Sequence, residues 1–251
     1  MTLLLRVEYD GTSYSGWQNQ LNAPTVQHQL ECAWRKLTGM QSSVIGSGRT
    51  DAGVHGRGQI AHIVLPENFR IPEHKIAKAL NSRLPKDIRI TAIQLTERDI
   101  QARFDAVSRE YSYSISTEES VFHRNYCWHI HFPFDVSLLR ESGKIFLGIH
   151  DFTTFSKLNH DTKNYVCNVS VCEWTEFQHS VRLRIKSDRF VYGMVRSLVG
   201  VMMDIARNRR SIEEVQSALA QKNRKLISTL APPQGLVLEK VCYPEEFNIV
   251  I

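Results

Sequence analysis

The chain has 251 residues, of which 42% are hydrophobic and 23% are charged. This composition is typical of a globular protein and excludes disordered, collagen-like and fibrous architectures. Lysine and arginine number 31 against 26 acidic residues, and the resulting net charge of +5 excludes no class of partner by itself.

Membrane and secretory segments are not expected. No apolar run approaches the roughly 18 residues that a membrane span needs, and the first residues lack the basic region and cleavage site of a signal peptide. The five cysteines are an odd number and are scattered, so we expect reduced thiols and no metal site. These features together predict a soluble, cytoplasmic protein.

The first half of the chain alternates strand and helix patterns. Residues 3–9 predict a strand, which ends in a turn-rich segment. Thr25 is a good N-cap for a helix that Gly39 stops, because the apolar residues between them recur at helical spacing. Further along, a β-rich run covers residues 60–65, a helix covers 72–81, and another strand covers 87–95.

The second half repeats this rhythm. The predicted strands cover residues 108–116, 166–174, 181–185 and 236–241, and the second and third of these form a hairpin. The predicted helices cover residues 136–146, 189–206 and 211–220. Strands and helices without strict alternation favour an α+β fold. We expect two similar halves, residues 1–100 and 101–251, that share a continuous, largely antiparallel sheet with helices packed on one side.

Positive charge is concentrated in residues 181–210. This segment holds eight arginines and lysines against two aspartates, an excess larger than that of the whole chain. A concentrated positive field suits a polyphosphate partner. The alternative is a basic surface that only faces solvent.

Residues 46–58 contain five glycines and cannot form a regular helix or strand throughout. They predict a loop whose backbone can approach a ligand closely, and Arg49, Asp51 and His55 are displayed on it. The spacing is that of neither a phosphate-binding P-loop nor a dinucleotide-binding motif. We expect His55 to shape the loop through hydrogen bonds. A long turn carrying solvated charges is the alternative.

The motif GRTDAGVH at residues 48–55 resembles the signature of the TruA family of tRNA pseudouridine synthases. Further segments resemble this family in the same order along nearly the whole chain: residues 9–18, 24–27, 103–104, 109–113, 148–155, 194–200 and 235–238. Two segments depart from the family pattern. Residues 204–210 stand where the family has a glycine-bearing turn, which could change how an RNA backbone is held, and Val237 stands where the family has tyrosine.

The resemblance implies the pseudouridine synthase fold and a tRNA-modifying isomerase that needs no cofactor. Such enzymes break the N1–C1′ bond of a uridine, rotate the uracil and rejoin it through C5. The resemblance also implies action at positions 38, 39 and 40 of the anticodon stem-loop of tRNA, and a homodimer. Two alternatives stay open: a synthase that acts on another RNA such as ribosomal RNA, and a non-catalytic RNA-binding module.

The resemblance assigns roles to three residues. Asp51 is the catalytic carboxylate, although attack on C1′, attack on C6 and removal of the C2′ proton all stay open. Arg49 fills the space that the flipped base leaves; a simple ion pair is the alternative. Tyr111 stacks on the target uracil and assists at C5, whereas the alternating pattern alone favours a core tyrosine, as it does for Tyr113.

Arg196 is the fourth residue of the implied site. Gly193 and Gly200 share its face of the predicted helix, which leaves a shallow surface around its guanidinium unless the two glycines serve only close helix packing. We expect Arg196 to pair with Asp51 and keep that carboxylate ionised. The remaining basic residues are candidates for RNA-backbone contacts: Arg182, Arg184, Arg207, Arg209 and Arg210.

Overall fold

The computed structural model of the chain describes all residues except 68, 158–161 and 228. The chain divides into two compact units, the first made of residues 1–107 and 237–251 and the second of residues 108–236. This division differs from the expected halves, because the last strand of the chain belongs with the first unit. That strand pairs in parallel with a strand of the first unit, a long-range contact that no local pattern in the sequence indicates.

The described chain has ten strands, whose pairing within each unit is mostly antiparallel with some parallel pairs, together with five α-helices. These features confirm the predicted α+β fold class. No helix among the described residues is long and apolar enough to cross a membrane.

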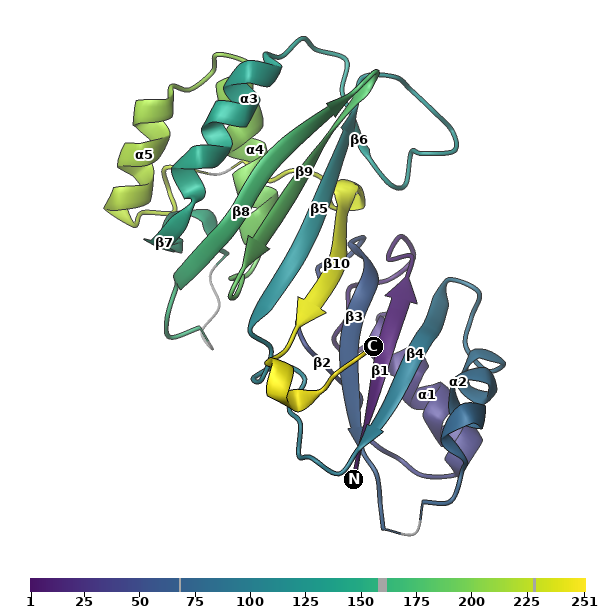
Figure 1. Ribbon diagram of the computed structural model, residues 1–251. Helices are drawn as coiled ribbons and strands as arrows, with labels where there is room; N and C mark the ends of the chain where they lie inside the picture. The colour runs from purple at the N-terminus through teal and green to yellow at the C-terminus, as the bar shows by residue number, and fades with distance from the viewer. Residues whose placement is uncertain (68, 158–161, 228) are drawn as a thin grey trace. The chain divides into compact units, whose positions relative to one another are not determined.

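The first unit has the strand order β4-β1-β3-β10, with β2 beside β3 (Figure 1). Its elements are β1 (Thr2–Tyr9), α1 (Val26–Thr38), β2 (Ile45–Gly46), β3 (His55–Val64), α2 (Glu73–Asn81), β4 (Ile88–Thr96) and β10 (Leu236–Cys242). Alternate residues of β1 enter one core with the apolar faces of both helices. Both helices therefore cover the same face of this sheet.

Helix α1 begins and ends where the sequence predicts. The Thr25 side chain accepts a hydrogen bond from the His28 backbone N–H at 3.3 Å, which satisfies one of the free donors at the helix N-terminus. Gly39 ends the helix in the left-handed conformation. Because both signals are local, they are readable from the sequence alone.

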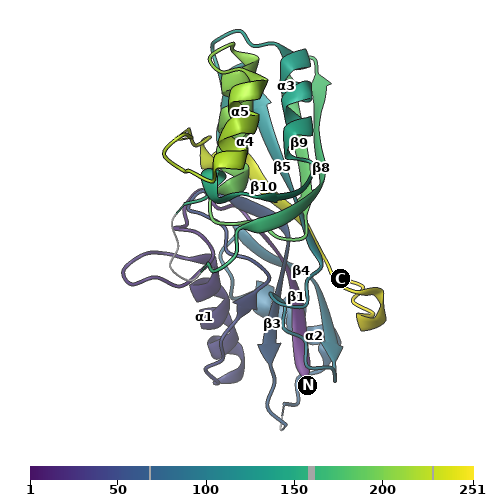
Figure 2. The same cartoon turned by 90° about the vertical axis from the view of Figure 1, so that its left-hand side faces the viewer.

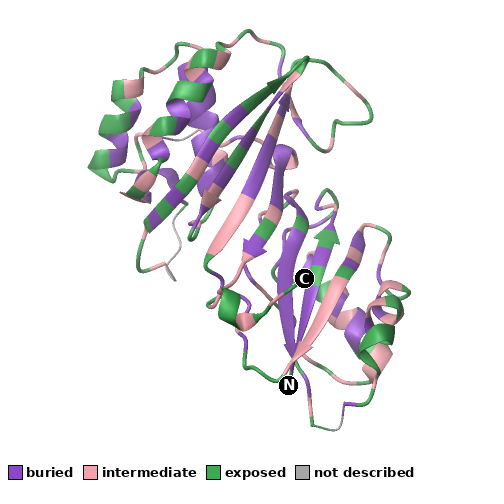
Figure 3. Ribbon diagram, in the orientation of Figure 1, coloured by how far each residue is buried: buried purple, intermediate pink, exposed green. Residues whose placement is uncertain are grey.

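The second unit has the strand order β5-β9-β8-β7, with β6 beside β5. Its elements are β5 (Ser108–Ser116), β6 (Trp128–His129), α3 (Val136–Gly143), β7 (Gly148–Asp151), β8 (Val166–Phe177), β9 (Ser180–Ser187), α4 (Met194–Ala206) and α5 (Ile212–Gln221). Figures 1 and 2 show the three helices against one face of the unit's strands. Residues along β8 and β9 alternate between buried and exposed (Figure 3).

Two expected boundaries are wrong. Strand β3 begins at His55, so the second part of the predicted glycine loop is extended strand. Helix α4 begins at Met194 rather than at 189, because Gly193 precedes it in the left-handed conformation with φ of 73°. A side chain is strained in that conformation, and a helix cannot continue through it.

Candidate functional site

The loop between β2 and β3 is fastened to the strand that follows it. The Ser47 N–H donates to the Ile60 carbonyl at 2.7 Å. The fully buried Gln59 side chain accepts from the Ser47 hydroxyl at 2.6 Å and donates to the Gly48 carbonyl at 2.9 Å. One amide thus fixes the two residues immediately before Arg49.

A second segment, residues 9–17, holds the loop from the other side. The Trp17 N–H donates to the Thr50 carbonyl at 3.1 Å, and the hydroxyls of Tyr9 and Thr50 lie 2.9 Å apart in a buried hydrogen bond. Gly16 has φ of 96°, and a Cβ there would lie 2.4 Å from the Thr50 carbonyl oxygen. Only glycine permits this approach of the two backbones.

Arg49 and Asp51 are displayed on this fastened loop. Arg49 is exposed and Asp51 is partly exposed, while Thr50 between them is buried. The backbone turns after Asp51, where the Val54 N–H donates to the Asp51 carbonyl at 3.1 Å. The loop therefore offers one carboxylate and one guanidinium to a ligand from a backbone that is anchored at several points.

His55 shapes the loop as predicted. Its ring is buried, and its Nδ1 accepts from the Gly11 N–H at 3.0 Å. Asp10 Oδ1 lies 3.2 Å from the same nitrogen. His55 fastens residues 10–11 to the start of β3.

The two tyrosines of β5 lie on its buried face. Tyr113 is fully buried, and its hydroxyl donates to the Pro232 carbonyl at 2.8 Å. Burial raises the Tyr113 pKa, which the nearby Arg196 guanidinium opposes. Tyr111 is 8% exposed and meets the edge of the Phe190 ring at a centroid distance of 5.1 Å. Tyr113 is thus a core residue, as predicted, whereas Tyr111 keeps a small exposed area.

Arg196 lies in the first turn of α4, in the second unit. Its Nε donates to the Ala231 carbonyl at 2.8 Å, and the Ala231 N–H donates back to the Arg196 carbonyl at 3.0 Å. Gly200 serves close packing, because a Cβ there would lie 3.0 Å from the Thr229 methyl group. The expected shallow surface is therefore absent at Gly200 in the described structure. The proposed pairing of Arg196 with Asp51 stays a prediction.

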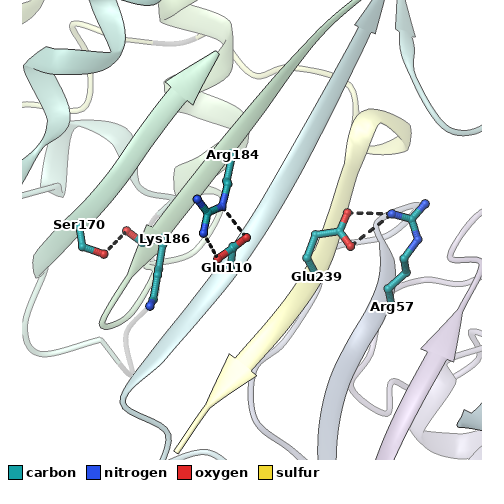
Figure 4. A network of polar contacts seen from close by, with 6 residues as sticks. All are labelled: Arg57, Glu110, Ser170, Arg184, Lys186 and Glu239. Atoms are coloured by element: carbon teal, nitrogen blue, oxygen red, sulfur yellow. Dashed lines mark hydrogen bonds and ion pairs between the residues drawn. The ribbon is translucent and has the colours of Figure 1, made fainter. Parts of the chain in front are cut away.

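The basic segment is divided between strand β9 and the end of helix α4. Arg182 and Arg184 project from β9 on the face away from the helices. Arg184 pairs with Glu110 of β5 through bonds of 2.8 and 3.1 Å (Figure 4), and this pairing raises the Arg184 pKa. Arg182 donates to the Ser114 hydroxyl at 3.3 Å. Such exposed pairs contribute little to stability, and both arginines are exposed.

The α4 C-terminal cluster, which consists of Arg207, Arg209 and Arg210, follows the other end of the helix. This cluster lies roughly 16 Å along the helix axis from Arg196, at 1.5 Å per residue. The Arg207 guanidinium stacks 3.5 Å from the centre of the Phe132 ring, and Arg210 lies 3.9 Å from Asp204. Arg209 is exposed.

Several positioning residues escape sequence reasoning. Gln59 shows no local signal, because its partners lie in a loop that only the fold brings back to it. Arg57 forms a 3.0 Å ion pair with Glu239 across β3 and β10 (Figure 4), and this contact too spans most of the chain. Tyr9 and Gly16 lie in a motif that the resemblance includes, so a signal for them exists. Among the described residues, no group of three histidine, cysteine or acidic side chains could hold a metal ion.

Known proteins with similar sequences cover almost the whole chain. The sequence profile of tRNA pseudouridine synthases matches residues 6–105 and 144–244, one segment in each half. The chain is 37% identical to tRNA pseudouridine synthase A of Chlamydia trachomatis over 98% of this chain and 93% of that protein. It is 38% identical to the enzyme of that name from Bacteroides fragilis over 95% of this chain and 94% of that protein.

A third relative comes from a species of Bacillus. The chain is 35% identical to tRNA pseudouridine synthase A of Bacillus pumilus over 97% of this chain and 99% of that protein. The profile match covers well over half of the chain, and the relatives match it from end to end. The chain therefore belongs to the tRNA pseudouridine synthase family, whose members are isomerases that convert uridine to pseudouridine.

Proposed function

We propose that this chain converts uridine to pseudouridine in tRNA, at positions 38, 39 and 40 of the anticodon stem-loop. The observation that carries the proposal is Asp51, a partly exposed carboxylate on an anchored loop, in a chain that belongs to this family over nearly its full length. The positions within tRNA rest on the resemblance to the TruA family alone.

The reaction requires few chemical groups. The N1–C1′ bond breaks, the uracil turns, and a C5–C1′ bond forms, after which the C5 proton leaves and N1 gains one. No electrons are gained or lost, so no redox partner is required. In this proposal Asp51 is the carboxylate that acts at the junction of sugar and base, because it is the acidic residue that the anchored loop displays.

Three further residues act on the target uridine in this proposal. Tyr111 stacks on the uracil and assists removal of the C5 proton. Flipping the target base out of the stem costs a few kcal/mol of stacking. Arg49 enters the stem in place of that base, because a planar guanidinium can stack and donate hydrogen bonds at once. Arg196 pairs with Asp51 and keeps it ionised. The RNA backbone meets the basic residues of β9 and the α4 C-terminal cluster.

The resemblance also supports a homodimer in the cytoplasm, and we include both in the proposal. Sedimentation of the purified protein across a range of concentrations measures its oligomeric state. A mass that corresponds to two chains is expected, and a monomer at all concentrations contradicts it.

The proposed function is tested by mapping pseudouridine in total RNA from cells with and without the protein, and in purified anticodon stem-loop hairpins treated with it. We expect pseudouridine at positions 38–40 of tRNA to depend on the protein. Loss confined to ribosomal RNA would identify a synthase with another target. No dependent site in any RNA, despite RNA binding, would leave a non-catalytic RNA-binding module.

A further inference from the structure

A cavity of about 270 Å³ opens beside the first turn of α4 in the second unit. Two cationic side chains line it, Lys157 and Arg224, which come from segments far apart in the sequence. Gly193 and Ser197, at the start of α4, also line it. No acidic residue lines the cavity among the residues that the structure describes, so its electrostatic potential favours an anion.

Arg224 lines this cavity and also carries a buried donor. Its Nη1 is shielded from solvent and has no hydrogen-bond partner within the described chain. The Arg224 guanidinium carbon lies 5.6 Å from the centre of the Tyr165 ring, and a ring face accepts no strong hydrogen bond. A buried donor on a charged group is costly without an acceptor. An anion in the cavity would lie beside this guanidinium and offset its charge.

Lys157 brings the second charge to the same place. Its backbone N–H donates to the Tyr192 carbonyl at 2.8 Å, and its aliphatic stem passes 3.4 Å from the position that a Cβ of Gly193 would occupy. Its ammonium group lies 5.2 Å from the centre of the Tyr192 ring. These contacts place the lysine stem beside the start of α4, while the residue itself is exposed to solvent.

The N-terminus of α4 also favours an anion in the cavity. The N-cap residue of the helix is Gly193, which has no side chain to bond to the N–H groups of the first turn. The N-terminus of a helix carries a partial positive charge and attracts anions. The Ser197 hydroxyl lines the cavity one turn further on. The Thr229 hydroxyl, in contrast, already donates to Asp204 at 2.8 Å.

We propose that Lys157 and Arg224 bind one phosphate group of an RNA backbone in this cavity. The inference rests on the proposed function, because Ser197 follows Arg196 directly and Arg196 is proposed to act at the target uridine. A phosphate has the oxygen acceptors that a guanidinium and an ammonium group recognise together. Both charges meet the same phosphate, so their contributions are coupled rather than additive.

The first test measures the affinity for tRNA at several salt concentrations. Lys157→Gln and Arg224→Gln each remove one charge, and Lys225→Gln removes the same charge from an exposed neighbour outside the cavity. We expect each cavity variant to weaken binding roughly tenfold, the scale of one charge-assisted hydrogen bond. The slope of log K against log salt is expected to flatten by about 0.7 to 0.9. The double variant is expected to add little, and Lys225→Gln to change nothing.

The second test locates the phosphate. A set of anticodon stem-loop hairpins is compared, in which each hairpin carries one neutral methylphosphonate linkage at a different position. We expect the wild type to bind one of these hairpins poorly. We expect the cavity variants to bind that hairpin no worse than the others. Arg224→Lys keeps the charge and is expected to keep the salt slope, and thermal unfolding shows whether each variant is folded. Stabilisation of the wild type by inorganic phosphate, with no linkage sensitivity, would overturn the assignment to RNA.

Two failures are distinguishable. A wild type that forms no pseudouridine in tRNA refutes the proposed function whatever the cavity binds. A wild type that forms pseudouridine, with cavity variants whose affinity and salt slope match Lys225→Gln, refutes the phosphate site alone.

Discussion

Replacement of Gln59 by leucine is expected to loosen the loop that carries Asp51. The substitution removes two hydrogen bonds, of 2.6 Å to the Ser47 hydroxyl and 2.9 Å to the Gly48 carbonyl. Each contributes about 0.5 to 1.5 kcal/mol, and Ser47 is buried, so the total loss is about 1 to 3 kcal/mol. For a chain of this size that loss lowers the melting temperature by about 2 to 12 °C.

The effect on activity distinguishes positioning from stability. A displacement of about 1 Å at a reacting group can cost 10²-fold in rate, so we expect pseudouridine formation at saturating RNA to fall by at least about tenfold. The matched control is Gln94→Leu in the same unit. Gln94 donates to the Asn248 carbonyl at 2.7 Å and accepts from the Val250 N–H at 2.9 Å, so this variant also loses two hydrogen bonds, but away from the loop.

Single-turnover rates and thermal unfolding of both variants decide the question. We expect both to be destabilised and only Gln59→Leu to be slow. If Gln59→Leu lost stability as the control does and kept the wild-type rate, the amide would not position the loop, and the reasoning from its two bonds would be refuted.

Three further predictions address other residues. Tyr111→Phe keeps the stacking ring but is expected to lose about 10²-fold or more in tritium release from C5-labelled tRNA, because C5 deprotonation needs a base; full activity would leave the hydroxyl without a role. Neutralising the α4 C-terminal cluster is expected to flatten the salt dependence of tRNA affinity by about two to three units, and an unchanged slope would make it a solvated surface. Burial raises the pKa of the Cys167 and Cys172 thiols to about 12; above pH 9 the unfolded chain therefore binds fewer protons than the folded one. Stability should fall by up to about 1.4 kcal/mol per pH unit for each thiol between pH 9 and 12, and urea unfolding of alanine variants is expected to show a shallower decline.

Local chemistry is what made much of the fold predictable. The Thr25 cap and the Gly39 stop delimit α1 because both act within a few residues, and the alternation along β5 places Tyr111 and Tyr113 on one face because the side-chain period of a strand is two. The start of α4 was predicted too early, since an apolar, arginine-containing run before Gly193 does not reveal that this glycine adopts a left-handed conformation.

Long-range contacts account for most of what the sequence did not reveal. The pairing of β10 with β3, the amide clamp of Gln59 and the partners of the basic segment all join residues that are distant in the chain. Arg182 and Arg207 belong to one charged run in the sequence, but Arg182 lies on strand β9 and Arg207 follows the C-terminal end of α4. The candidate Asp51 was found because its glycine-rich surroundings form a compact motif.

The measurement that tests the central claim most directly is release of tritium from tRNA labelled at uridine C5, by the wild type and by Asp51→Asn. The substitution keeps the size of the side chain and removes its charge, so folding and tRNA affinity are expected to stay near those of the wild type. We expect the rate of release to fall by at least about 10³-fold, the scale seen when one essential catalytic group is removed. A folded, tRNA-binding Asp51→Asn protein that releases tritium at a rate close to that of the wild type would contradict the assignment of the reaction to Asp51.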